Sequence, residues 1–253
     1  MIPLLLYHSV SEEHDPRFQE WAVHPDLFAA HMAYLADEGY QALTVRDLVA
    51  GRARHEALSA RPVVVTFDDG FADFHTAAWP VLRRHGMTAT VFIATGYIGA
   101  TSGWLATERP MMTWEQVAEL AQDGVECAAH GHDYLQLDTV PAARAWTDIV
   151  RSKRELERVV GSVTSFAYPH GYYTRRLQHQ VAQAGFTSAC GVRDALSPPG
   201  DDRFALARVV VRGGTDVDGL RRALGGRPAR GARPVRRAAW RTVRRTRRVC
   251  LDG

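Results

Sequence analysis

Residues 63–70 have the sequence Val63-Val64-Val65-Thr66-Phe67-Asp68-Asp69-Gly70. The first five residues are apolar or β-branched, which is typical of a strand buried in a parallel sheet. This strand pattern stops at two carboxylates and a glycine, and a helical pattern follows. Because α/β proteins place their chemistry at the carboxyl ends of parallel strands, the stretch predicts both a central strand and the position of a site.

The adjacent aspartates that end this strand need an explanation of their own. Two neighbouring carboxylates repel each other and are costly to desolvate together. The pair therefore indicates that one carboxylate binds a cation while the other stays free to accept a proton. The alternative is structural, because Asp68 or Asp69 could also cap the following helix or stand in its first turn.

Strand and helix patterns alternate on both sides of the central strand. The expected strands cover residues 4–7, 41–43, 63–67, 88–93, 125–129, 165–168, 187–190 and 207–211. The expected helices cover residues 25–35, 44–50, 71–84, 113–123, 139–160, 174–184 and 216–224. This alternation predicts an α/β domain with a parallel sheet, and the Gly-, Ser- and Thr-rich residues 95–112 are predicted to form a long functional loop.

Length and composition favour one large domain in a chain of 253 residues. The apolar share of 46% and the charged share of 23% are ordinary for a soluble globular protein, and no apolar run reaches the roughly 20 residues of a membrane span. Residues 1–8 lack the basic region and long apolar core of a secretory signal, so we expect a cytoplasmic protein. The three distant cysteines fit buried thiols in a reducing compartment.

The charge distribution divides the chain into a body, residues 1–225, and a basic tail, residues 226–253. The tail has ten arginines and one acid, a net charge of +9, so the total of +3 leaves −6 for the body. It is either a disordered solvated extension or an amphipathic helix that contacts an anionic membrane surface at the inner face. Nucleic acid is disfavoured as a partner, because the tail has no recognised fold and the acidic body offers no groove.

Polar residues stand at the ends of four predicted strands. They are His8, the pair Asp68 and Asp69, His130, and the turn that contains His170. At one barrel mouth they would supply carboxylate and imidazole ligands for a divalent ion, a second carboxylate as base and a second imidazole as acid. This convergence is more informative than any one residue, because a single histidine is more often structural than catalytic.

Three segments carry a family resemblance. They are Thr66-Phe67-Asp68-Asp69-Gly70, Glu126-Cys127-Ala128-Ala129-His130 and Phe166-Ala167-Tyr168-Pro169-His170-Gly171. In this order and spacing they resemble the polysaccharide deacetylase family, which is the NodB homology domain of carbohydrate esterase family 4. The opening Leu6-Tyr7-His8 is similar to the permuted branch that includes the poly-N-acetylglucosamine deacetylases. The resemblance covers roughly residues 3–212 and implies a distorted, seven-stranded (β/α) barrel.

The resemblance also implies roles for individual residues. Asp68 would be the general base that activates water, and Asp69 and His130 would bind the metal, for which zinc is the expected ion. His8 would be the catalytic acid that protonates the departing amine. His170 matches the residue whose backbone N–H, together with the metal, stabilises the oxyanion of the tetrahedral intermediate.

The chain departs from the family pattern at the second metal histidine. Four residues after His130 the chain has Tyr134, and an unperturbed tyrosine ionises only near pH 10. The site could bind metal weakly, use Tyr134 as a phenolate, or recruit His132 or Asp133 instead. A second departure is Arg208, which stands where other members have a histidine two residues after a leucine, so the acid must come from His8.

The implied reaction is metal-dependent hydrolysis of an N-acetyl group from an acetamido sugar, with release of acetate and a free amine. Trp21 and Trp104 are candidates for stacking on the sugar, and Tyr168 and Pro169 are expected to contact it. Without a signal segment we expect a small glycoside, a natural-product intermediate or a lipid-linked precursor as substrate. The alternatives are a catalytically weakened carbohydrate-binding relative and a membrane-associated deformylase or deacetylase of a lipid-linked sugar.

Overall fold

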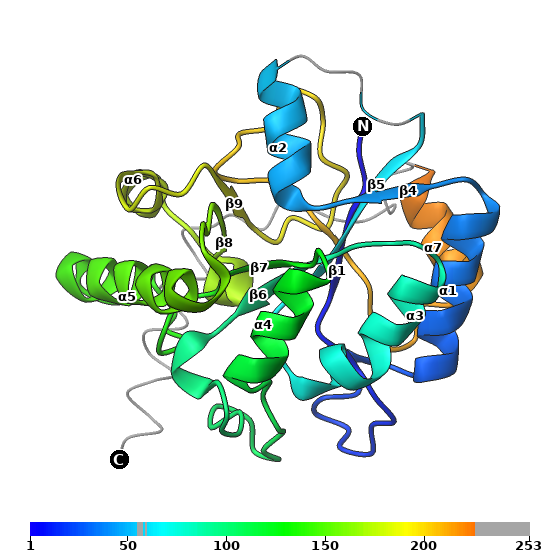
Figure 1. Ribbon diagram of the computed structural model, residues 1–253, viewed down its shortest axis with the longest axis horizontal. Coiled ribbons are helices and arrows are strands. Elements are labelled where there is room, and N and C mark those ends of the chain that lie inside the picture. The colour runs from blue at the N-terminus through cyan, green and yellow to red at the C-terminus, as the bar shows by residue number, and fades with distance from the viewer. Residues whose placement is uncertain (55–57, 59, 226–253) are drawn as a thin grey trace.

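The computed structural model places the predicted central strand, β5 (Pro62–Phe67), in the middle of a parallel sheet (Figure 1). The sheet has the order β10-β1-β5-β6-β7-β8-β9, and β4 also pairs with β5. The other strands are β1 (Leu4–Tyr7), β4 (Gln41–Leu43), β6 (Thr90–Ile93), β7 (Glu126–Ala129), β8 (Ser165–Ala167), β9 (Ser188–Cys190) and β10 (Val209–Val210). The structure describes residues 1–54, 58 and 60–225.

One continuous segment joins the two edges of this sheet. Leu206 exchanges backbone hydrogen bonds with β9, because its N–H donates to Ala189 O at 2.9 Å and its carbonyl accepts from Gly191 N at 3.0 Å. A few residues later, β10 pairs with β1. The seam between β9 and β1 is therefore closed by residues 206–210, and the predicted seven-stranded barrel is confirmed, with β4 as an additional strand.

Helices surround the barrel, and neighbouring helices pack on one another, α4 on α5, α5 on α6, and α1 on α3 and α7. They are α1 (Pro25–Asp37), α2 (Val45–Arg54), α3 (Trp79–Arg84), α4 (Trp114–Gln122), α5 (Ala142–Val160), α6 (Arg175–Gln183) and α7 (Val217–Leu224). Short helical turns are η2 (Thr95–Tyr97) and η3 (Pro169–Gly171). The helix starts follow local sequence signals, as at α4, where Thr113 and Gln116 form a capping box.

One local prediction needs correction, and one small sheet was not predicted. The single helix predicted for residues 71–84 is a π-helical turn, η1 (Phe74–Ala78), followed by α3. The reason is Pro80, which has no N–H to continue the α-helical hydrogen bonds of the preceding turn. A two-stranded parallel sheet of β2 (Ser9–Val10) and β3 (Ala22–Val23) was not predicted, because two residues are too few to show a period.

Alternation along β5 separates the two faces of the barrel wall. Val63, Val65 and Phe67 pack in the core between sheet and helices, whereas Val64 packs in a second core inside the barrel. The same alternation sends Thr66 and then Asp68 toward the interior. At the amino end this interior is closed by α2, whose Val45 and Leu48 belong to the inner core.

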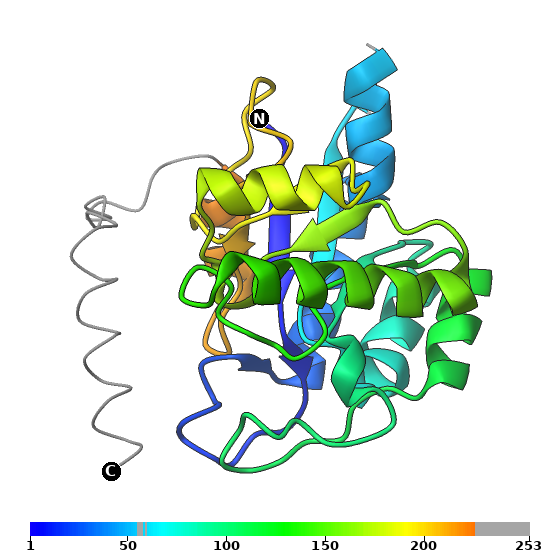
Figure 2. The same ribbon diagram turned by 90° about the vertical axis from the view of Figure 1, so that its left-hand side faces the viewer.

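The end opposite α2 carries two long loops, residues 11–21 and 98–112, which we call the rim loops (Figures 1 and 2). The carboxyl ends of the parallel strands face this end. The closed amino end and the open carboxyl end therefore leave one place for a site, at the mouth between the rim loops.

The predicted tail, residues 226–253, lies outside the described residues, so its membrane contact stays a prediction, as does the cytoplasmic location. In the described part of the chain, no helix combines the length and the apolar character that a bilayer crossing requires.

We predict that Phe28→Ala destabilises the fold by about 3–5 kcal/mol, the range for deleting a buried phenyl ring. Phe28 is fully buried, and its ring makes edge contacts with the rings of Tyr7 at 5.3 Å and Phe67 at 5.7 Å. Urea unfolding measures the loss. Val159→Ala, at a side chain that is 39% exposed, is the control and should change stability by less than about 0.5 kcal/mol. Equal effects of the two changes would contradict the assigned core.

Candidate functional site

The predicted site residues follow the carboxyl ends of separate strands. His8 follows β1, Asp68 and Asp69 follow β5, His130 follows β7, and the turn of His170 follows β8. Because these strands are parallel, all five residues lie at the mouth of the barrel. The sheet therefore brings together residues that are up to 162 positions apart in the sequence.

The centre of the site is formed by His130 and the two aspartates. His130 Nε2 lies 3.4 Å from Asp69 Oδ1 and 3.9 Å from Asp68 Oδ2. Its Nδ1 lies 2.9 Å from Ala167 O and donates to this carbonyl, which turns Nε2 toward the carboxylates. Burial alone would lower the pKa of His130, but the charges of Asp68 and Asp69 outweigh burial and raise it.

Tyr134 closes the site beside Asp69. Its ring stacks on Trp104 with centroids 4.1 Å apart and meets the edge of His130 at 5.6 Å. Burial, followed by the charge of Asp69, raises the pKa of Tyr134 well above its usual value. In this structure the phenol therefore keeps its proton and faces Asp69 as a neutral group.

His8 stands on the other side of the aspartates. Its ring meets Trp21 at 4.9 Å, and its Nδ1 is buried without a hydrogen bond. Burial lowers the pKa of His8, although the charges of Asp69 and Asp68 oppose this shift. Within the described residues, no hydrogen bond therefore holds this nitrogen of the imidazole.

Backbone strain is concentrated at the same place. Four described residues other than glycine have positive φ values, and three of them are Asp69 at 75°, Tyr134 at 54° and His170 at 61°. The fourth is Asp194. Non-glycine residues at positive φ cost free energy and cluster at functional sites, where the surrounding structure holds them. The strain therefore marks the mouth of the barrel independently of side-chain chemistry.

His170 occupies an exposed turn at the edge of this group. Its ring lies 4.7 Å from the ring of Tyr134. The turn is tight, since a Cβ at Gly171 would stand 2.5 Å from Val192 Cγ2. The position therefore brings the backbone of residues 169–171 close to the mouth.

Arg208 is a site residue whose contact with Asp68 was not predicted. It lies at the barrel seam, is fully buried, and forms a fork on Asp68 with Nη1–Oδ1 at 2.6 Å and Nη2–Oδ2 at 2.7 Å. It also donates to Gly191 O at 3.1 Å and to Thr66 Oγ1 at 3.2 Å. Burial by itself would raise the pKa of Asp68, but Arg208 and His130 lower it overall, so the carboxylate stays ionised.

Asp148 is a second residue that sequence reasoning missed. From α5, its carboxylate accepts the backbone N–H groups of His132 at 3.0 Å and Asp133 at 2.7 Å. Gly131 is required beside it, because a Cβ there would lie 2.6 Å from Asp148 Oδ2. Asp148 therefore shapes the loop that carries His130 and Tyr134. Its position within a predicted helix gave no signal of this contact.

The structure does not bring His132, one of the alternative ligands, to the aspartates. Its Nδ1 lies 2.9 Å from both Thr95 Oγ1 and Glu155 Oε2. It lines a separate cleft of about 480 Å³ between η2, α4 and α5. The intervening Gly131, at φ 77°, turns the chain so that His130 and His132 face different sides of the loop.

The predicted substrate contacts separate into two groups. Trp21 and Trp104 lie at the mouth, where they touch His8 and Tyr134 respectively. Tyr168 and Pro169 are instead buried, and the hydroxyl of Tyr168 donates to Phe204 O at 3.0 Å. Their burial does not support the prediction that they contact the substrate, and the hydroxyl of Tyr168 is already bonded to the segment of Phe204.

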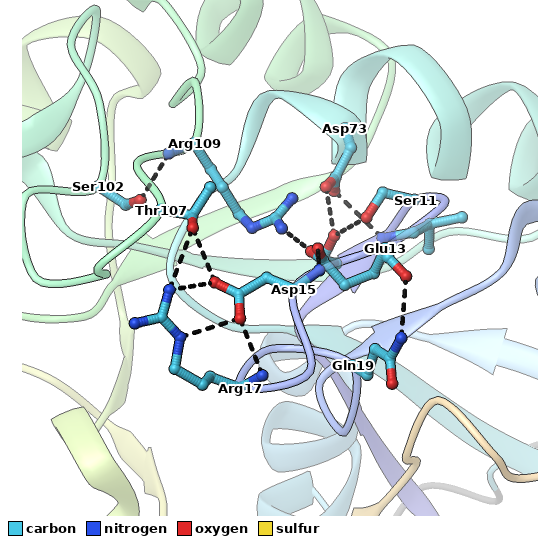
Figure 3. A network of polar contacts seen from close by, with 11 residues as sticks. Ser11, Glu13, Asp15, Arg17, Gln19, Asp73, Ser102, Thr107 and Arg109 are labelled. Carbon is cyan, nitrogen blue, oxygen red and sulfur yellow. Dashed lines mark hydrogen bonds and ion pairs between the residues drawn. The ribbon is translucent and has the colours of Figure 1, made fainter.

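The rim loops are tied to each other by charged and polar contacts (Figure 3). Glu13 of the first loop forms an ion pair with Arg109 of the second. Asp15 accepts from Thr107 Oγ1 at 2.7 Å. These contacts join the loop that carries Trp21 to the loop that carries Trp104, so both tryptophans are held on one rim.

The donor set fits a divalent cation in part. Asp69 Oδ1 is buried without a hydrogen bond, and Nε2 of His130 is directed at it, so both atoms suit a metal that takes oxygen and nitrogen ligands. Among residues 1–54, 58 and 60–225, no three His, Cys, Asp or Glu side chains form such a group. Tyr134 lies beside this pair, with its ring 5.6 Å from that of His130.

Comparison with known proteins identifies the family of this chain. The family model described as polysaccharide deacetylase matches residues 55–189. YxkH of Bacillus subtilis (strain 168), which is named as a polysaccharide deacetylase, is 30% identical over 214 residues, 84% of this chain and 72% of YxkH. The poly-β-1,6-N-acetyl-D-glucosamine N-deacetylase of Escherichia coli (strain K12) is 27% identical over 133 residues, which are 49% of this chain and 20% of that protein.

Among solved structures, the deacetylase PplD of Streptococcus pyogenes in complex with acetate has the same fold. The TM-score is 0.78 at 22% identity, and the match covers 88% of this chain and 97% of PplD.

We predict that Arg208→Met destabilises the protein by about 3–5 kcal/mol, because it leaves the ionised Asp68 buried without a partner. Adding Asp68→Asn should recover part of the loss, since no uncompensated charge then remains. Urea unfolding at pH 7 measures both variants. The matched control is Arg212→Met, whose exposed guanidinium pairs with Glu20 and should contribute less than about 1 kcal/mol. A double variant no more stable than Arg208→Met would contradict the charge argument.

Proposed function

Because this chain belongs to the polysaccharide deacetylase family, we propose that it hydrolyses the N-acetyl group of an acetamido sugar with the help of a divalent metal ion. The proposal is carried by one observation. The ionised Asp68, the unpaired oxygen of Asp69 and the directed Nε2 of His130 meet at one barrel mouth. A base and a cation site are thereby adjacent, as hydrolysis of an unreactive amide requires.

Asp68 serves as the general base. The Arg208 fork fixes the plane of the carboxylate and keeps it ionised, while each oxygen retains a second lone pair that can accept a proton. Asp68 therefore takes a proton from water as the water oxygen adds to the acyl carbon. The fork also limits the reorientation of the carboxylate during this step.

Asp69 and His130 would hold the metal ion, with the Tyr134 hydroxyl as the third protein group. When bound, the ion acts as a Lewis acid that polarises the acyl carbonyl. The hydrogen bond that His130 Nδ1 donates to Ala167 O fixes the imidazole, so that Nε2 stays available as a ligand. We propose zinc, because it accepts this mixture of oxygen and nitrogen donors.

His8 and His170 act on the other atoms of the amide. His8 gives a proton to the nitrogen as the C–N bond breaks, so that the product leaves as a neutral amine. The backbone N–H of His170 donates to the oxygen that becomes negative in the tetrahedral intermediate. His8 lies on the Trp21 side of the aspartates and His170 on the Tyr134 side, which supports this division.

The substrate class follows from the rim and from the relatives. Trp21 and Trp104 offer amphipathic aromatic faces beside the reacting groups, a property suited to sugar rings. The E. coli relative is named for poly-β-1,6-N-acetyl-D-glucosamine. We propose an N-acetylated glucosamine unit as the group that this chain binds.

Tyr134 favours one alternative, a carbohydrate-binding relative with weakened turnover. A neutral phenol is a poorer ligand than imidazole, and burial with the charge of Asp69 keeps it neutral here. Metal content and acetate release, measured together, separate the two functions.

We predict that Asp68→Asn lowers acetate release from an N-acetylglucosamine oligomer at least about 100-fold while zinc stays bound, because the base is lost and the side chains of Asp69 and His130 remain. The variant also removes the carboxylate partner of the buried Arg208, so its folding must be checked. Asp69→Ala should lose both turnover and zinc. Acetate is measured enzymatically and zinc by mass spectrometry of the dialysed protein, and circular dichroism confirms folding.

The wild-type protein treated with chelator and then resupplied with zinc is the control. Its turnover should fall and return. Full turnover by Asp68→Asn would rule out this residue as the base. A wild-type protein that binds zinc and the oligomer but releases no acetate would favour the carbohydrate-binding alternative.

We predict that Tyr134→His tightens zinc binding at least about tenfold, because imidazole replaces a protonated phenol in the ligand set. Competition with a chromogenic zinc chelator measures the affinity. Tyr97→His is the matched control, since Tyr97 also contacts Trp104, at 4.6 Å between ring centroids, and should leave zinc affinity unchanged. Unchanged zinc affinity in Tyr134→His would show that Tyr134 is not at a ligand position.

A further inference from the structure

Asp73 is a half-buried acid that the proposed mechanism does not use. It lies four residues after Asp69 and directly precedes η1. Burial raises the pKa of its carboxyl to about 6, against the hydrogen bonds that favour the charged form. Holding an ionised carboxylate in such a position costs stability, so the residue needs a reason beyond packing.

The contacts of Asp73 all lie on the residues that follow His8. Asp73 Oδ2 accepts from Ser9 Oγ at 2.5 Å, and Asp73 Oδ1 accepts from Val10 N at 3.2 Å. The hydroxyls of Ser9 and Ser11 are 2.7 Å apart, so with Ser9 donating to Asp73, Ser11 donates to Ser9. Figure 3 shows Asp73 and Ser11 at one end of the polar network of the rim loops.

The orientation of His8 depends on the hydrogen bonds between Asp73 and the neighbouring Ser9 and Val10, because the contacts of His8 itself are weak. Its Nδ1 makes no hydrogen bond, and its ring rests on Trp21 by an edge contact. The adjoining β2 pairs with β3 over only two residues, and a pairing of this length is marginal by itself. Charge-assisted hydrogen bonds such as those to Asp73 are shorter and roughly twice as strong as neutral ones.

We propose that Asp73 is a positioning residue for the general acid. Its hydrogen bonds to Ser9 and Val10 hold the adjoining His8 so that the imidazole points at the departing nitrogen. The inference rests on the proposed function, in which His8 is the acid. Asp73 touches neither the aspartates nor the substrate in this scheme. Its effect is therefore confined to the step in which the C–N bond breaks and nitrogen receives the proton.

The test compares two leaving groups. An amine leaves an acetamido sugar only with a proton from the acid, whereas 4-nitrophenoxide leaves 4-nitrophenyl acetate as a stable anion and needs none. We expect Asp73→Ala to lower kcat for acetate release from an N-acetylglucosamine oligomer about 10- to 100-fold, with KM little changed. The rate with 4-nitrophenyl acetate should change less than about threefold, since base and metal ligands are untouched.

His8→Ala supplies the reference for this pattern. It should show a larger loss with the oligomer and the same tolerance with the ester. Adding Asp73→Ala to His8→Ala should cause no further loss, because both changes remove the same function. An additive loss would overturn the proposal.

Asp47→Ala is the matched control, because Asp47 accepts from Thr44 Oγ1 at 2.7 Å and Thr44 N at 3.4 Å beside α2, at the opposite end of the barrel. It should leave both rates unchanged. If Asp73→Ala does not fold, Ser9→Ala removes one donor only and should show the same selective loss, about 3- to 10-fold.

Equal loss on both substrates, or no loss, in the folded variant would overturn the role of Asp73 alone. A His8→Ala protein without selective loss would instead remove the acid from the proposed function. The two failures are therefore distinguishable.

Discussion

The buried ion pair between Arg208 and Asp68 is the interaction on which the site depends. Arg208 belongs to the segment that pairs first with β9 and then with β1, so the guanidinium stands where the barrel closes. Asp68 ends the central strand on its inner face. A charge that is fully withdrawn from water must be paired. The two hydrogen bonds of the fork pair the Arg208 guanidinium with the Asp68 carboxylate. The closed barrel therefore places Arg208 next to Asp68, and this contact keeps the proposed base ionised.

Around this ion pair, three residues at the mouth of the barrel have an unfavourable backbone conformation. Asp69, Tyr134 and His170 have left-handed backbone, and each follows a strand whose register is fixed by the sheet. Asp148 holds the loop between His130 and Tyr134 from α5. Strain of this kind persists only when surrounding contacts determine it, and the rigid strands with their buried carboxylate partners provide those contacts. The fold thereby fixes the backbone of these three residues at the mouth of the barrel.

Electrostatics then gives similar side chains different properties. The charges of Asp68 and Asp69 raise the pKa of His130, whereas burial dominates at His8 and lowers its pKa. Arg208 keeps Asp68 ionised, while Asp69 keeps an oxygen without a hydrogen bond. Two histidines and two aspartates therefore have distinct environments within one site.

The sequence by itself determined the order of strands and helices and the residues that end the strands, because both depend on local periodicity and on the ends of apolar runs. It therefore placed His8, Asp68, Asp69, His130 and His170 after the ends of strands, where the structure also has them. Only the tertiary structure decided the partner of Asp68, which is 140 residues away, and the directions of His132 and Tyr168, which face the outer cleft and the core. Periodicity carries no information about contacts across the barrel seam or about single turns at positive φ. These depend on how the strands close, and closure is a property of the whole sheet.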